Sequence, residues 1–311
     1  MAKAQFYTKK NPFAHTYSIV ARDSITGEMG VAVQSHWFSV GPLVAWGQSG
    51  VGVVATQSFI NSSFGPRGLS LLKSGIMPKA AILALLETDE GRDVRQLAIL
   101  NKNGDAFAYT GKNCIDFAGH LVGQDFSVQA NLMANQGVPE AMAAAFSTTT
   151  SSLAERMMAA LEAAQKVGGD VRGQQSASLL VVRAVSTGNE WEDKLVDLRV
   201  DDHPNPLSEL RRLLQIQTAY DFMNKGDHAI EVGKMAEAKQ HYQKAQSLNP
   251  DNMEMKFWYA VTLSNNDEFV EAKTIFKLIF QKEKHWQVLV PRLVKAGLLT
   301  ISKEELNALL D

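Results

Sequence analysis

Alternation of apolar and polar positions dominates the first part of the chain. Three β-branched runs predict strands at residues 16–22, 30–34 and 50–58. In the first run Tyr17, Ile19 and Ala21 share one face, because successive strand residues point to opposite sides. The dipeptide Thr26-Gly27 supplies a turn between the first two runs. The pattern therefore predicts a hairpin whose first residue is a hydroxyl residue, Thr16.

The remaining patterns up to about residue 205 alternate between helices and strands. Helices are expected at residues 66–72, 78–87, 140–146 and 153–167. Further strands are expected at residues 94–101, 106–110, 126–132, 176–185 and 195–200. Many of the connections are too short for the crossovers of a parallel sheet, which excludes a Rossmann-type fold. The order favours an α+β fold in which two antiparallel sheets lie between helix layers, a four-layer αββα sandwich.

Composition changes near residue 205, where His203-Pro204-Asn205-Pro206 marks a seam. Of the 22 glycines, only three follow this point, and charged residues become denser. Beyond the seam Glu237-Ala238-Lys239 recurs as Glu271-Ala272-Lys273, at an offset of 34 residues. A small all-α repeat domain is therefore expected after the sandwich.

The repeated segment resembles the tetratricopeptide repeat over residues 219–284. The first copy matches the pattern at Phe222, Gly226, Gly233, Ala238, Tyr242, Ala245 and Pro250. The second copy departs from it, with Asp267 where glycine is usual and Lys284 where proline is usual. Residues 285–299 are then expected to form a capping helix. Such repeats imply a peptide or protein partner held by the helices.

Charge and cysteine content narrow the classes of function. The net charge of −2 gives no attraction to nucleic acid or to an anionic membrane. No run of about 18 apolar residues predicts a membrane span, and the N-terminus lacks the apolar core of a secretory signal. The single cysteine, Cys114, cannot form an internal disulfide and is expected to be a structural thiol. A cytoplasmic protein is expected.

Seven separated segments, in order, resemble a bacterial family, domain-of-unknown-function family 1028. They begin at His15-Thr16-Tyr17-Ser18, Val33-Gln34-Ser35-His36, Gly65-Pro66-Arg67-Gly68, Val94-Arg95-Gln96, Val128-Gln129-Ala130-Asn131, Gly173-Gln174-Gln175-Ser176 and Asp197-Leu198-Arg199-Val200. The resemblance covers residues 14–215 and implies the N-terminal-nucleophile hydrolase fold with suspected amide hydrolysis. The expected parts are an N-terminal extension (1–14), an N-terminal-nucleophile hydrolase-like domain (15–205), a connecting helix (206–218), and tetratricopeptide-like repeats with a capping helix (219–311).

In that superfamily the first residue of the mature chain is the nucleophile, and its own amine is the base. Thr16 heads the first strand, as this chemistry requires, but fifteen residues precede it. Catalysis by Thr16 therefore requires cleavage after His15. Ser18, Ser35 and His36 are the candidate catalytic neighbours. The alternative is that these hydroxyls are structural and that His36 packs beside aromatic residues.

Polar residues elsewhere are candidates for substrate binding. Arg67 is expected in a turn just before a helix, where it could bind an anion or simply cap the surface. Arg95 lies in a strand and needs an acidic partner if it is buried. Gln57 ends a strand, and Gln129 and Asn131 share a strand face, where they could bind a carbonyl or pair with each other. Asp201-Asp202-His203 lacks a second ligand cluster, so neither a metal nor a cofactor is expected.

The leading functional hypothesis is hydrolysis of a small amide or cyclic amide, that is, of a non-protein C–N bond. The competing class is a non-catalytic binding or scaffold protein that uses its helical repeats to hold a partner. A third hypothesis is an enzyme of this fold that needs no free terminal nucleophile. Whether the chain forms a homo-oligomer stays open.

Overall fold

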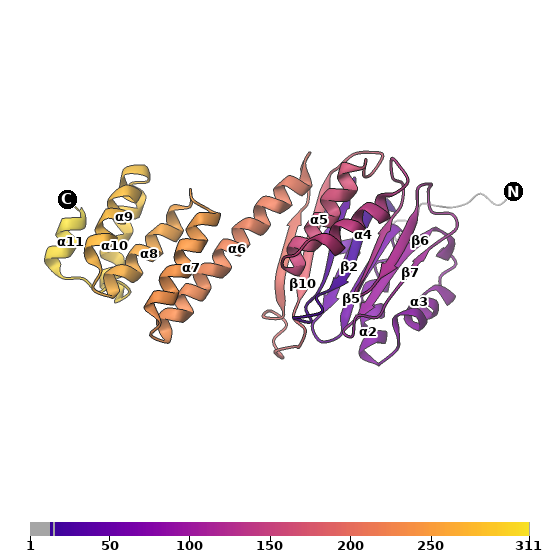
Figure 1. Ribbon diagram of the computed structural model, residues 1–311, viewed down its shortest axis with the longest axis horizontal. Coiled ribbons are helices and arrows are strands. Elements are labelled where there is room, and N and C mark those ends of the chain that lie inside the picture. Colours follow the sequence, from indigo (N-terminus) through magenta and orange to yellow (C-terminus); the bar gives the residue numbers. More distant parts are fainter. Residues whose placement is uncertain (1–12, 15, 311) are drawn as a thin grey trace. The chain divides into compact units, whose positions relative to one another are not determined.

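A computed structural model describes residues 13, 14 and 16–310 (Figure 1). The chain divides into two compact units, with the boundary after Leu213. Most of the predicted N-terminal extension, residues 1–12, lies outside the described residues, as does His15. Each unit is considered by itself below.

The first unit contains two antiparallel sheets. Along the six-stranded sheet the described strands are ordered β11 (Lys194–Val200), β10 (Ser176–Val182), β3 (Met29–Ser35), β2 (Thr16–Arg22), β9 (Phe126–Ala130) and β8 (Gly119–Gly123). The predicted hairpin is its centre, since β2 and β3 pair from Thr16↔Ser35 to Arg22↔Met29. In the described part of the other sheet the order is β1 (Phe13–Ala14), β5 (Gly52–Phe59), β6 (Arg95–Asn101) and β7 (Ala106–Thr110), with β4 (Ala45–Gln48) also on β5.

Helices cover the outer face of each sheet (Figure 1). The six-stranded sheet carries α4 (Val138–Thr148) and α5 (Leu153–Lys166). The five-stranded sheet carries α2 (Phe64–Lys73) and α3 (Pro78–Glu87). The short helices α1 (Gly41–Val44) and η1 (Arg92–Val94) lie in connections. The predicted α+β fold, a four-layer αββα sandwich, is confirmed.

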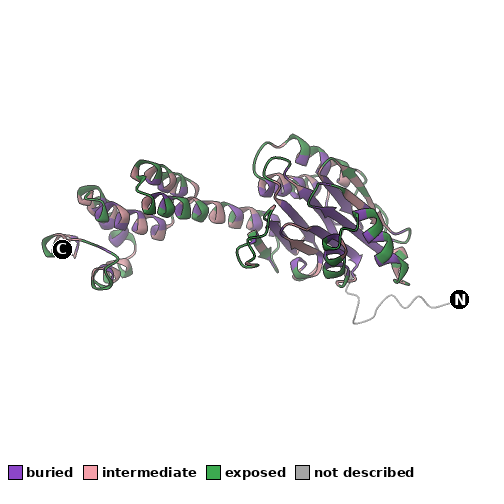
Figure 2. Ribbon diagram, turned by 90° about the horizontal axis from the view of Figure 1, so that it is seen from below, coloured by how far each residue is buried: buried purple, intermediate pink, exposed green. Residues whose placement is uncertain are grey.

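Both faces of the central strands are buried, as Figure 2 shows for the two sheets. Between the sheets an apolar core gathers Val20, Val31, Val53, Ala98 and Leu100, among others. A second core lies between the five-stranded sheet and its helices. Burial of these aliphatic side chains, at about 25 cal/mol per Å² of apolar surface, is the main stabilising term of such a sandwich. The sheets are thus held face to face, and any polar residue between them must find its partners there.

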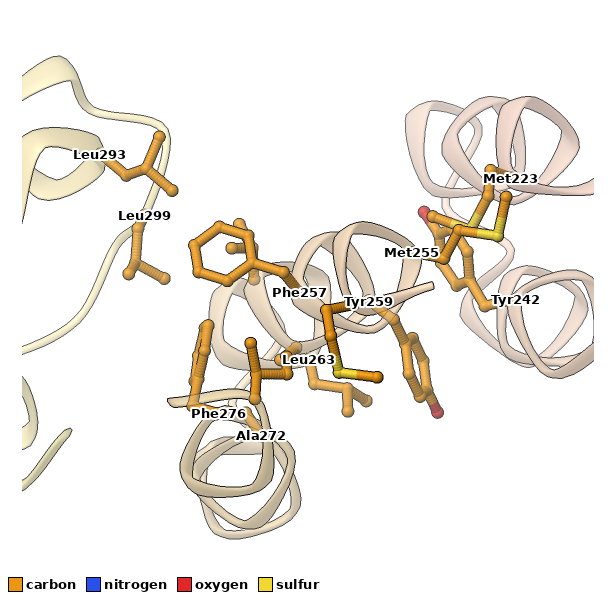
Figure 3. Packing of buried hydrophobic residues seen from close by; sticks show 14 of the residues in the cluster. Met223, Tyr242, Met255, Phe257, Tyr259, Leu263, Ala272, Phe276, Leu293 and Leu299 are labelled. Carbon is orange, nitrogen blue, oxygen red and sulfur yellow. The ribbon is translucent and has the colours of Figure 1, made fainter. Parts of the chain in front are cut away.

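The second unit is helical. Its described helices are the later part of α6 (Pro206–Glu231), α7 (Met235–Leu248), α8 (Met253–Asn265), α9 (Phe269–Lys282), α10 (His285–Ala296) and α11 (Lys303–Leu310). Aromatic and methionine side chains fill the spaces between them (Figure 3). A Cβ atom at Gly226 would lie 2.5 Å from the Tyr242 ring, so glycine is needed for this helix crossing. Gly226 and Tyr242, two positions that match the repeat pattern, therefore meet where α6 and α7 cross.

Some elements were not predicted from the sequence. They are the strands β1, β4 and β8 and the helices α1, η1 and α11. Helix α11 carries a readable signal, because the Glu305 amide donates to the Ser302 hydroxyl and the Ser302 amide to the Glu305 carboxylate. This reciprocal pair is a capping box. Among the helices of the described chain, none combines the length and the apolarity that crossing a membrane requires.

Candidate functional site

The facing surfaces of the two sheets change from apolar to polar along the strands. On β2 the inward positions run from Val20 through Ser18 to Thr16, because alternate residues share a face. On β5 and β6 the inward positions end at Gln57 and Gln96. We call the resulting cluster the polar layer; its members are Thr16, Ser18, Ser35, Gln57, Gln96, Gln129 and Asn131. All seven residues are fully buried.

Hydrogen bonds join the two sheets through the polar layer. Ser18 Oγ donates to Gln57 Oε1 (2.6 Å) and accepts from Gln129 Nε2 (2.7 Å). Gln57 Nε2 donates to Gln96 Oε1 (2.6 Å), and Asn131 Nδ2 donates to the same oxygen (2.9 Å). The layer thus brings together six of the site residues predicted from the sequence: Thr16, Ser18, Ser35, Gln57, Gln129 and Asn131. Burial makes these bonds obligatory, since an unpaired buried amide costs about 1–3 kcal/mol.

Thr16 lies at the edge of this network. Its Oγ1 donates to Ser35 Oγ at 3.4 Å, directly across the β2–β3 pair. Its carbonyl oxygen accepts from three nitrogens: Asn131 N (3.1 Å), Gln57 Nε2 (3.2 Å) and Asn131 Nδ2 (3.3 Å). The position of the Thr16 backbone is therefore fixed by both sheets. Thr16 itself is fully buried.

Gln96 is a member of the layer that sequence reasoning missed. Its Nε2 donates to the Ala130 carbonyl (2.9 Å), to Thr110 Oγ1 (2.9 Å) and to the Gly119 carbonyl (3.1 Å). Strand parity places Gln96 on the face of Ala98 and Leu100, but both faces of β6 are buried, so the sequence does not show which face meets the other sheet. A glutamine on the buried face of a strand is expected to take part in a network.

His36 follows β3 and takes no part in the described hydrogen bonds of the polar layer. Its backbone N–H donates to Asp170 Oδ2 at 3.3 Å. Its Nδ1 is buried and has no hydrogen-bond partner among the described residues. Ser35, in contrast, faces the layer beside Thr16. Ser35 and His36 are neighbours in the sequence but make separate contacts.

The two arginine candidates lie outside the polar layer. Arg67 is exposed and donates to Thr88 Oγ1 at 3.3 Å. It lies inside α2, which begins at Phe64, so the expected turn before the helix is wrong. Proline is tolerated in the first helical turn, and Pro66 therefore does not delay the helix start.

Arg95 is buried and has the acidic partner that the sequence required. Its Nε lies 2.6 Å from Asp89 Oδ2, and its Nη1 donates to the Phe59 carbonyl. The Cys114 Sγ donates to the Arg95 carbonyl at 3.4 Å. Burial raises the pKa of the Cys114 thiol, which agrees with the structural role predicted for it. Arg95 supports the end of β5 from outside the layer.

The acidic residues after β11 are used in local contacts. Ser39 Oγ donates to Asp201 (2.7 Å), Gln175 Nε2 donates to Asp202 (3.1 Å), and the Asn205 amide donates to His203 Nδ1 (3.0 Å). Within the described ranges, no group of three or more His, Cys, Asp or Glu side chains is placed to hold a metal ion. An open pocket of about 600 Å³ lies elsewhere, between residues 116–119 and the start of α4, and Thr16 does not line it.

The fold and the polar layer define a protein with a two-sheet α+β unit followed by helical repeats of the tetratricopeptide class, a class that serves protein interaction. The family of unknown function DUF1028 matches residues 16–210, and the chain belongs to that family. A tetratricopeptide repeat family matches residues 229–287.

Among solved structures the chain is similar to protein SPO2555 from Silicibacter pomeroyi, a crystal structure described under the same family. The two are 32% identical, with a TM-score of 0.60, over 66% of this chain and 86% of that chain. No curated protein matches the chain. The resemblance inferred from the seven segments is thus confirmed at the level of the family.

Proposed function

We propose that the chain is an amide hydrolase of the N-terminal-nucleophile type, activated by cleavage of the bond between His15 and Thr16. Its substrate would be a small or cyclic amide. One observation supports this proposal above the others. Thr16, the first residue of the central strand β2, is anchored through its carbonyl in a buried polar layer between two sheets.

The proposed chemistry uses groups already placed around Thr16. After cleavage the Thr16 amine accepts the proton of its own hydroxyl, and the oxygen attacks the substrate carbonyl carbon. The C–N bond breaks, the leaving amine takes that proton, and water hydrolyses the threonine ester. Ser35 Oγ, 3.4 Å from Thr16 Oγ1, would orient the hydroxyl. The Asn131 side-chain amide, which lies beside Thr16, is a candidate donor to a developing oxyanion.

Burial of Thr16 in the uncut chain is consistent with an inactive precursor. While residue 15 is attached, the Thr16 nitrogen is an amide and cannot act as a base. Release of the preceding residues would free the amine and open the position before it. Catalysis would therefore begin only after maturation.

The same burial also supports a second candidate function. A polar layer whose members bond to one another could serve only to fix the register of the two sheets. The protein would then be a scaffold that binds a peptide or protein partner through its helical repeats. In that case neither a small-molecule substrate nor cleavage before Thr16 is required.

Intact-mass measurement of the purified chain separates these candidates. The hydrolase proposal expects a chain that begins at Thr16, and it expects the Thr16→Ala chain to keep all residues before that position. A Ser208→Ala chain serves as a matched hydroxyl control and should mature normally. A wild-type chain that stays uncut and hydrolyses no amide would favour the scaffold.

A further inference from the structure

The segment before Thr16 occupies a strand edge. In β1, Phe13 pairs with Phe59 and Ala14 with Ser58, antiparallel to β5. The other edge of β5 is taken by β6, which pairs with Gly52–Ser58. On the edge shared with β1, β4 reaches only Gly52–Ala55. Removal of β1 would therefore leave the C-terminal end of β5 with backbone groups ready to pair with another extended chain.

This edge adjoins the proposed nucleophile. Gln57, in the same stretch of β5, donates to the Thr16 carbonyl at 3.2 Å. Only one residue separates Ala14 from Thr16, so β1 leads directly to the bond that maturation would break. The residues that precede this bond are the acyl side of the first amide that the Thr16 hydroxyl would attack.

The end of β5 is also held in a fixed shape. Ser58 has φ +69°, a left-handed conformation that is uncommon for a residue with a side chain. Such strained residues cluster at ligand-binding sites. Arg95 binds the Phe59 carbonyl and is itself paired with Asp89, so the guanidinium fixes the strand end from behind. A preformed edge of this kind costs little to order when a ligand binds.

We infer that the edge of β5 at Ser58–Phe59 is the acyl-side binding site of the mature protein. It binds amides whose acyl half is a short extended peptide, which pairs antiparallel to β5 in the place of β1. This inference rests on the proposed function, because it assumes that one hydroxyl attacks both the precursor bond and the substrate. The substrate class is then a peptide-like small amide. Main-chain hydrogen bonds provide the affinity, as in other cases of strand addition.

The test uses a chain whose start at Thr16 does not depend on self-cleavage. Four substitutions create a site for a protease that cuts after an introduced arginine: Pro12→Ile, Phe13→Glu, Ala14→Gly and His15→Arg. If this junction resists the protease, the same mature chain is produced as a ubiquitin fusion that begins at Thr16. The described core residues all follow the cut. The probe is a synthetic peptide with the sequence of residues 10–15, and binding is measured by calorimetry.

The peptide is made in three forms: unmodified, N-methylated at Phe13, and N-methylated at Ala14. Only one of two successive amides in an antiparallel strand points to its neighbour. We expect the unmodified peptide to bind with a Kd below about 1 mM. One N-methyl group should weaken binding at least about tenfold, and the other should change it less than about twofold. The uncut Thr16→Ala chain, whose own β1 fills the edge, should bind the peptide at least about tenfold more weakly than the mature chain.

Absence of binding at about 1 mM, or equal effects of the two N-methyl groups, would overturn the inference. A chromogenic amide of the same peptide tests the proposed function in parallel. Binding with the alternating effect but no hydrolysis removes the hydrolase proposal and leaves the binding site. Hydrolysis of amides without the alternating effect removes the binding site and leaves the hydrolase.

Discussion

Substitution of Gln57 by methionine tests how much the polar layer contributes to the stability of the first unit. The Gln57 amide contacts Ser18 Oγ, Gln96 Oε1 and the carbonyls of Thr16 and Gln129. Its nitrogen has two hydrogens, so three of these contacts can be full hydrogen bonds, one accepted and two donated. At about 1 kcal/mol each, their loss should lower the free energy of unfolding of this unit by about 3 kcal/mol. Methionine preserves the length of the side chain and therefore leaves little cavity.

Hydrogen exchange read by mass spectrometry gives this free energy for the segment that carries β5. A loss of 3 kcal/mol corresponds to exchange about a hundredfold faster at amides that open by global unfolding of the unit. Gln124→Met is the matched control, because Gln124 is exposed and bonds only to its neighbour Asp125 among the described contacts. The control should stay within about 0.5 kcal/mol of wild type. A loss below about 1 kcal/mol for Gln57→Met would refute the idea that these bonds act as a buried network.

Three further predictions concern other parts of the chain. Gly226→Ala should destabilise the second unit by about 1–3 kcal/mol, measured by hydrogen exchange of α6 and α7, because the new Cβ would lie 2.5 Å from Tyr242; an unchanged rate would contradict the packing. In the folded chain Cys114 should react with iodoacetamide at least about a hundredfold more slowly than in the denatured chain, because burial raises the pKa of its thiol. Rapid labelling of the folded chain would be inconsistent with this. Burial alone raises the pKa of Asp23, but hydrogen bonds from two backbone amides and the charge of Arg156 outweigh this effect, so the folded pKa lies below its ordinary value of 3.8. Asp23 therefore stabilises the fold at pH values above 3.8, and this stabilisation is lost as the pH falls through the lower folded pKa. In urea denaturation at a series of pH values, Asp23→Asn should remove this part of the loss of stability in acid. Equal dependence of stability on pH in the two chains would argue against it.

The sequence predicts the order of elements well where one periodicity is continuous. Helix α3 was expected at residues 78–87 and is found at Pro78–Glu87, because a proline start and an amphipathic pattern mark it. Short elements were missed for physical reasons. Strand β8 lies at the edge of its sheet, begins and ends with glycine, and has exposed residues among its five. Strand β1 has only two residues and pairs with β5, which lies more than forty residues away in the sequence.

The sequence predicts only some members of the polar layer. Both faces of the central strands are buried, so alternation alone does not tell which face meets the other sheet. Thr16 and Ser18 were proposed from their place at the head of a strand, and they do lie in the layer. Gln96 was missed because its three acceptors come from separate parts of the chain. His36 and Arg67 were grouped with Thr16 by sequence motifs, which carry no information on tertiary distance.

The shared oxygen of Gln96 has a consequence for how this protein can vary. Gln57, on β5 of one sheet, and Asn131, which follows β9 of the other, both donate to that one atom. Replacement of Gln96 removes an acceptor from both Gln57 and Asn131, and replacement of either donor takes one of the two bonds away from the Gln96 oxygen. Single replacements should therefore be disfavoured even where each new residue suits its own position. Across related chains these three positions should therefore change together or not at all. Substitutions in one sheet would then depend on substitutions in the other.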